Sequence, residues 1–105
     1  MRRNAIALAA VIATGAPVTA GAQDNPLAAR DLAAACAMCH GTDGAAAPVA
    51  GSIPPLAGES SDKIAQRLKE FRDGKRPATV MHQIAKGYND HQIDAMAAYF
   101  AAQKK

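Results

Sequence analysis

Two cysteines and a histidine lie within five consecutive residues of this 105-residue chain. Cys36, Cys39 and His40 have the spacing C-x-x-C-H, which is typical of a c-type haem attachment site. Two thiols three residues apart on a helical turn can add to the two vinyl groups at one edge of a porphyrin. The histidine that follows is then held beneath the iron, where its imidazole can act as the proximal ligand. The motif therefore predicts one covalent haem c, with His40 bound to its iron.

Two other kinds of site share part of this pattern. C-x-x-C is the redox pair of thioredoxin-like proteins, but their fold needs strands and a βαβ unit, and the sequence shows no strand pattern. A structural zinc site needs four ligands. The remaining histidines, His82 and His91, lie nine residues apart, outside the usual zinc spacing. A dithiol enzyme using Cys36 and Cys39 would have free thiols and no colour, which distinguishes it from a haem protein.

A sixth ligand to the iron must come from later in the chain. The methionines of the chain are Met1, Met38, Met81 and Met96. Met38 is tied to the proximal side, and Met96 falls on the apolar face of the last predicted helix. Met81 follows a connector that can bring it over the distal face, so it is the preferred axial ligand, with His82 as its main competitor. His/Met ligation raises the reduction potential, whereas an open sixth position would instead indicate a haem sensor or ligand-binding protein.

The first residues have the pattern of a secretory signal. A short basic start is followed by a chargeless apolar run over residues 5–16 and by small residues up to Ala22. The apolar run is too short to span a bilayer, which disfavours a membrane anchor. We expect residues 1–22 to be a signal peptide cleaved after Ala22, and residues 23–105 to be one monohaem domain in the periplasm.

The composition of the expected mature domain favours a large buried cofactor. The chain has two Phe, two Tyr and no Trp, and its two cysteines exclude a disulfide framework. A domain of this size is close to the limit at which a hydrophobic core alone becomes marginal, and a porphyrin would bury the apolar surface that the side chains lack. The net charge of +3 falls to +1 without Arg2 and Arg3, so nucleic-acid binding gains no support.

Turn and capping residues divide the mature chain into helices without strands. The expected helices cover residues 27–39 after a cap at Asn25, residues 61–72 after Ser60 or Ser61, residues 79–86, and the end of the chain after a capping box of Asn89 and Gln92. The expected buried faces are Ile64, Leu68 and Phe71 in one helix and Ile93, Met96, Ala97 and Phe100 in the last. Residues 41–58 form a Gly- and Pro-rich loop, long enough to wrap a cofactor.

Two features of the surface can be assigned only in part. The basic residues Arg67, Lys69, Arg72, Lys75 and Arg76 form either a docking patch or, as the preferred interpretation, a solvated helix face. His91, in the first turn of the last helix, is expected at the surface. Tyr88 can pack near the haem edge or the distal turn, and the sequence leaves both options open.

These motifs together resemble the class I cytochromes c over essentially the whole mature region. The resemblance implies an all-α fold of about four helices wrapped around one covalently bound haem. It implies that the first and last helices cross, with Tyr99 or Phe100 packed on a small residue of the first. It also implies that the carbonyl of Pro54 accepts a hydrogen bond from the proximal histidine, and that Leu56 contacts the haem.

A closer resemblance covers residues 71–90, F-R-D-G-K-R-P-A-T-V-M-H-Q-I-A-K-G-Y-N-D. This run is similar to the cytochrome subunit of flavocytochrome c sulfide dehydrogenase, in which the corresponding methionine, here Met81, is the axial ligand. The resemblance implies a non-catalytic electron carrier that receives electrons from a sulfide-oxidising FAD flavoprotein. Some members carry two haem domains, whereas this chain has a single C-x-x-C-H motif. The alternative is a freely diffusing cytochrome that carries electrons to a terminal oxidase or reductase.

Overall fold

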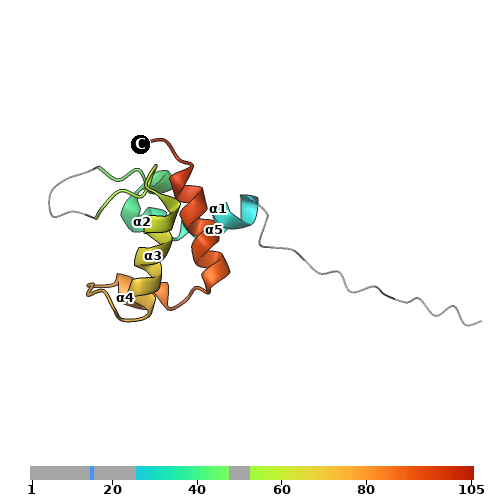
Figure 1. Cartoon of the computed structure of the whole chain (residues 1–105). Helices are drawn as coiled ribbons and strands as arrows, with labels where there is room; N and C mark the ends of the chain where they lie inside the picture. The colour runs from blue at the N-terminus through green and yellow to red at the C-terminus, as the bar shows by residue number, and fades with distance from the viewer. Residues whose placement is uncertain (1–14, 16–25, 48–52) are drawn as a thin grey trace, which may run out of the picture.

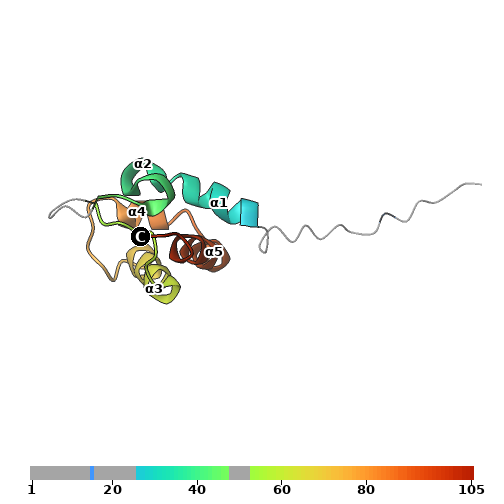
Figure 2. The same ribbon diagram turned by 90° about the horizontal axis from the view of Figure 1, so that it is seen from above.

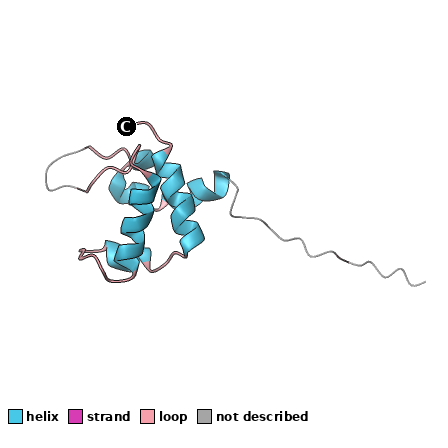
Figure 3. Cartoon of the chain, in the orientation of Figure 1, coloured by secondary structure: helices cyan, strands magenta, loops and turns pink. Residues whose placement is uncertain are grey.

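The computed structural model describes Gly15 and residues 26–47 and 53–105, and this part of the chain is helical without strands (Figures 1 and 3). Its elements are α1 (Pro26–Ala34), α2 (Ala37–His40), the 3₁₀ turn η1 (Thr42–Gly44), α3 (Ser61–Arg72), α4 (Met81–Ala85) and α5 (Asp90–Ala101). The all-α prediction is confirmed. None of the helices in the described part has the length and apolarity needed to cross a membrane. Apart from Gly15, the predicted signal peptide lies outside the described residues, as does the predicted cap Asn25.

The predicted single helix over residues 27–39 is wrong, because the chain turns between α1 and α2. The N–H of Cys36 donates to the carbonyl of Ala33 over 3.0 Å, which tightens the end of α1 into a shorter-range turn. The carbonyl of Cys36 then accepts from the N–H groups of Cys39 and His40, at 3.2 and 2.9 Å. High alanine content favours a helix throughout this stretch, but it does not determine where the axis bends.

A small apolar core lies where α1, α3 and α5 meet. Its buried members are Ala33, Ile64, Ala97 and Phe100. The predicted inner face of α5 is confirmed, because Ile93 and Met96 are also buried. The two views show α1 lying against α5 (Figures 1 and 2), and the contacts between these helices place Phe100 in the same cluster as Ala33. Phe100, with Tyr99 packed beside it, is therefore the aromatic that meets a small residue of the first helix.

The described parts of the loop over residues 41–58 are tied back to the helices. The carbonyl of Gly44 accepts hydrogen bonds from the N–H groups of Leu56 and Ala57, at 2.8 and 3.1 Å. Gly44 has a φ of +77°, and a Cβ there would lie 2.8 Å from a ring carbon of Phe100 and 2.9 Å from the Leu56 Cβ. This close approach requires glycine, both for its backbone conformation and for space.

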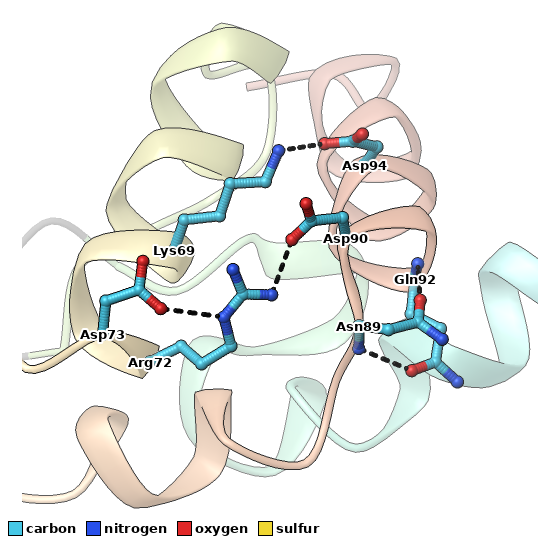
Figure 4. Close-up of polar contacts among 7 residues, drawn as sticks. All are labelled: Lys69, Arg72, Asp73, Asn89, Asp90, Gln92 and Asp94. Carbon is cyan, nitrogen blue, oxygen red and sulfur yellow. Dashed lines mark hydrogen bonds and ion pairs between the residues drawn. The ribbon is translucent and has the colours of Figure 1, made fainter.

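The predicted caps of α3 and α5 are present, and α4 is shorter than predicted. Ser60 accepts a hydrogen bond from the N–H of Lys63 at 3.4 Å. Asn89 and Gln92 form a full capping box, with bonds of 2.9 and 3.0 Å (Figure 4). The helix expected over residues 79–86 covers only Met81–Ala85, and it begins without a side-chain cap from Val80.

Ion pairs join the outer sides of α3 and α5. Lys69 contacts Asp94 at 3.0 Å, and Arg72 contacts Asp90 at 2.6 Å (Figure 4). The hydrogen bond from Arg72 holds the pKa of Asp90 below its usual value. Exposed pairs of this kind contribute little to stability, but they occupy two members of the basic cluster within the chain. The interpretation of the whole cluster as a solvated helix face stays a prediction.

Replacing Gly44 with Ala tests the close approach described above. We expect a loss of about 3 kcal/mol in the free energy of unfolding, because the new Cβ meets Phe100 and Leu56 and the backbone must keep a positive φ. Gly74→Ala is the matched control, since Gly74 has a similar φ of +73° but no atom within 4 Å of its ideal Cβ. It should lose only about 1 kcal/mol. Equal losses in denaturant unfolding would show that the contacts of Gly44 are unimportant.

Candidate haem site

The proximal side of the site is built by the short helix α2. Cys36 is half-buried and Cys39 is exposed, and neither forms a disulfide. His40 is buried, with 8% of its surface exposed, and its Nδ1 lies 2.6 Å from the carbonyl oxygen of Pro54. With Nδ1–H donating to that carbonyl, the lone pair of Nε2 is left to bind a metal. The structure thus contains the His40–Pro54 contact that the resemblance implied.

A cavity of about 500 Å³ lies between α2, α3, α4 and the loop before α3. This volume is typical of pockets that bind a small molecule or cofactor. Every residue that the sequence predicted for the haem site borders it, namely Cys36, Cys39, His40, Pro54, Leu56 and Met81. Its apolar walls are completed by Leu68 and Phe71 of α3, which sequence periodicity had assigned to a buried face. The residues that carry the predicted chemistry are therefore brought together around one cavity.

The positions of the candidate side chains distinguish between the possible distal ligands. Met81, at the start of α4, borders the cavity, whereas His82 does not. The Nδ1 of His82 is buried without a hydrogen-bond partner among the described residues. Met96 also borders the cavity but is 1% exposed within the core of α5, and Met38 is 91% exposed on α2. The geometry favours Met81 over His82.

The surroundings of the Cys36 thiol do not match those of a reactive redox cysteine. Burial, and then the nearby Cys39, raise the pKa of the Cys36 thiol. Reactive redox cysteines instead have a lowered pKa, because only the thiolate is a nucleophile.

Among the described residues, no group of three or more His, Cys, Asp or Glu side chains is placed to hold a metal ion. The zinc hypothesis therefore finds no ligand set in this part of the chain.

Several polar residues of the cavity were not assigned to it from the sequence. Glu59, Arg67, Arg76 and Tyr88 all border it. For Arg67 a signal existed, since it lies three residues after Ile64 and one before Leu68, at the edge of the predicted apolar face. Tyr88 had been left open between two positions, and the structure places it at the cavity. His91 is exposed, as predicted.

A family model described as "Cytochrome C oxidase, cbb3-type, subunit III" matches residues 23–100, from before α1 to the buried Phe100 of α5. The chain belongs to the cytochrome c family. The cofactor of this family is haem c, and the cavity fits it chemically: its walls are apolar, two thiols lie at its edge, and an imidazole and a thioether border it. A bound haem would be held by Cys36, Cys39 and His40.

Curated relatives of the chain are cytochromes. It is 42% identical over 74 residues to the cytochrome subunit of sulfide dehydrogenase from Chlorobaculum tepidum, an alignment that covers 70% of the chain and 64% of that protein. It is 31% identical over 101 residues to cytochrome c4 from Pseudomonas aeruginosa, covering 96% of the chain and 49% of the relative. It is 37% identical over 81 residues to cytochrome c-554(548) from Halomonas halodenitrificans, covering 73% and 94%. The chain thus spans about half to two thirds of the first two relatives.

A hydrogen bond joins the turn after the C-x-x-C-H motif to the last helix, α5. The hydroxyl of Tyr99 donates to the carboxylate of Asp43, whose backbone has a φ of +53°. This bond, together with desolvation, raises the pKa of Tyr99. The protonated tyrosine is therefore the form that holds Asp43 in its unusual conformation.

Replacing Tyr99 with Phe should destabilise the protein at pH 7 and change its response to alkali. Because the folded-state pKa of Tyr99 is raised, its stabilising effect is complete below the unfolded-state pKa of about 10 and is lost as the pH rises through the folded-state pKa. The wild type should therefore have a higher thermal midpoint than Tyr99→Phe at neutral pH. This difference should become smaller as the pH rises above about 10. A difference that stays constant at all pH values would contradict the role of this hydroxyl.

Proposed function

We propose that this protein transfers electrons in the periplasm through a single covalently bound haem c. Its thioether links are to Cys36 and Cys39, and its axial ligands are His40 and Met81. The observation that carries the proposal is that both thiols, the His40 imidazole and the Met81 thioether border one largely apolar cavity. The sequence contains one C-x-x-C-H motif, which supports a single haem.

In this proposal, the residues around the cavity bind the haem, orient its ligands and set its reduction potential. Bound haem supplies a one-electron couple, and the protein sets its potential and its access to water. The carbonyl of Pro54 orients the His40 ring and increases its basicity. The thioether of Met81 fills the sixth position, favours the ferrous state and leaves no open site for a substrate. Leu56, Leu68 and Phe71 keep the surroundings apolar.

Location in the periplasm is part of the proposal and depends on the segment before the domain. Residues 1–22 have the charge and hydropathy pattern of a cleaved signal peptide. A covalent bond to the cofactor suits an exported protein, because a haem that dissociated outside the cytoplasm would be lost by diffusion. N-terminal sequencing of the mature protein should therefore begin at Gln23.

The proposed electron donor is a sulfide-oxidising FAD flavoprotein. It is supported by the 42% identity over 74 residues to the cytochrome subunit of sulfide dehydrogenase from Chlorobaculum tepidum. The second candidate is a freely diffusing carrier to a terminal oxidase or reductase. It is supported by cytochrome c-554(548), of which the chain covers 94%. Affinity purification from the native host distinguishes the two candidates. An FAD protein that copurifies and reduces the haem with sulfide favours the first, and the absence of such a protein favours the second.

The cofactor assignment is tested by expressing the full chain with a cytochrome c maturation system. The mature protein should be coloured, its intact mass should exceed that of the polypeptide by one haem, and denaturation should not release the haem. Its low-spin ferrous spectrum should be unchanged by carbon monoxide, which a haem sensor with an open sixth position would bind. A colourless protein with the mass of the polypeptide alone would refute the proposal.

The distal ligand is tested by Met81→Ala. We expect the weak near-infrared band of a methionine–iron bond in the ferric protein to disappear and the reduction potential to fall, because a thioether stabilises the ferrous state. Two matched variants serve as controls. His82→Ala should retain the band, and so should Met96→Ala, which instead removes a core side chain at a cost of about 2–5 kcal/mol. A band that survives Met81→Ala, or is lost in His82→Ala alone, would rule out Met81.

A further inference from the structure

The charged residues of the cavity differ in how far the chain itself neutralises them. Its ionisable side chains, other than those of the haem-binding motif and Tyr88, are Glu59, Arg67 and Arg76. Glu59 is paired with Lys63 at 3.5 Å and with Lys105 at 4.0 Å. Arg76 is paired with Glu70 at 2.8 Å. Arg67 makes no hydrogen bond or ion pair with any of the described residues. The pKa of Glu70 is lowered first by its hydrogen bonds with Gln66 and Arg76, and the charge of Arg67 contributes least to this shift.

The nearest candidate partner of Arg67 on α3 is already occupied. Glu70 lies three residues further along the helix, where a carboxylate can reach an arginine. However, one of its oxygens accepts from Gln66 and the other from Arg76, each at 2.8 Å. The guanidinium of Arg76 is further held over the ring of Phe71, 5.8 Å from its centroid. Glu70 thus fixes Arg76 and leaves the donors of Arg67 available.

A haem brings the anions that such a site lacks. The porphyrin carries two propionate groups at the side away from its vinyl groups, and the proposed attachment to Cys36 and Cys39 fixes the vinyl side. Guanidinium forms bidentate, charge-assisted hydrogen bonds with carboxylates, which are among the strongest that side chains make. Arg67 is exposed but borders the cavity, so its guanidinium can reach a carboxylate at the cavity mouth.

We propose that Arg67 binds a haem propionate and thereby raises the reduction potential of the protein. This inference rests on the proposed haem and names a further residue that binds it. The ferric state has one more positive charge than the ferrous state, and a propionate left unpaired would stabilise that charge. By neutralising the propionate, Arg67 shifts the balance towards the ferrous form. Arg76, held by Glu70, does not take this role.

The test compares Arg67→Gln with Lys75→Gln in the mature haem protein. Both variants remove one positive charge from an exposed position, but Lys75 borders the groove between α3 and α5 and not the cavity. Arg67→Gln should lower the midpoint potential clearly more than Lys75→Gln does. It should also shift the ¹H NMR signals of the propionate methylene groups in the ferrous protein, whereas Lys75→Gln should leave them in place. The near-infrared band and the mass should show that the ligation and the haem content are intact.

The remaining variants keep the assignment open to refutation. Arg67→Lys retains the charge but not the planar fork, so its potential should lie between wild type and Arg67→Gln, with the propionate signals shifted. If Arg67→Gln does not mature, unshifted signals in Arg67→Lys overturn the proposal. It is also overturned if Arg67→Gln and Lys75→Gln behave alike, or if only Arg76→Gln moves the propionate signals. A wild-type protein without haem would instead refute the proposed function itself, so the two failures are distinguishable.

Discussion

The hydrogen bond between the His40 ring and the carbonyl of Pro54 connects two stretches that lie 14 residues apart in the chain. It closes the loop that begins after the cysteines and orients the imidazole towards the cavity. The hydrogen bonds from Leu56 and Ala57 to the carbonyl of Gly44 join the same two stretches of the chain. Without this closure, the proximal histidine and the wall formed by Leu56 would have no fixed relation to each other. The site is therefore organised by backbone groups of a loop as much as by side chains.

The core and the cavity are continuous, because Ile64 and Phe100 belong to both. Ala33, Ala97 and Phe100 hold α1 and α5 together, and Ile64 adds α3 to that cluster. Leu68 and Phe71 of α3 and Met81 of α4 extend this apolar surface around the cavity. Ala33 and Ala97 are small and allow α1 and α5 to approach closely. The walls of the cavity provide further apolar surface that a cofactor could bury. This agrees with a domain whose stability depends on a large cofactor.

Much of this arrangement could be predicted from the sequence, because the signals involved are local. The caps at Ser60 and Asn89 and the buried face of α5 follow from short-range spacing, and the structure confirms them. The break before Cys36 could not be predicted, since Ala33, Ala34 and Ala35 all favour a helix and the short-range bond from Cys36 to Ala33 has no signal in the sequence. The polar residues of the cavity were missed for a related reason. Arg67 is exposed and also borders the cavity. The sequence does not show that both oxygens of Glu70, its possible partner on α3, are bonded to Gln66 and Arg76.

The ion pairs along α3 have a consequence for how the protein meets other molecules. Lys69, Arg72 and Arg76 each contact an acidic residue of their own chain. Their fields are therefore largely dipolar and decay faster with distance than those of isolated cations. The long-range attraction felt by an approaching acidic protein is then weaker than the number of basic residues suggests. Encounter with a partner is governed by the few charges that have no internal counterpart, and its rate depends less on ionic strength than composition alone would indicate.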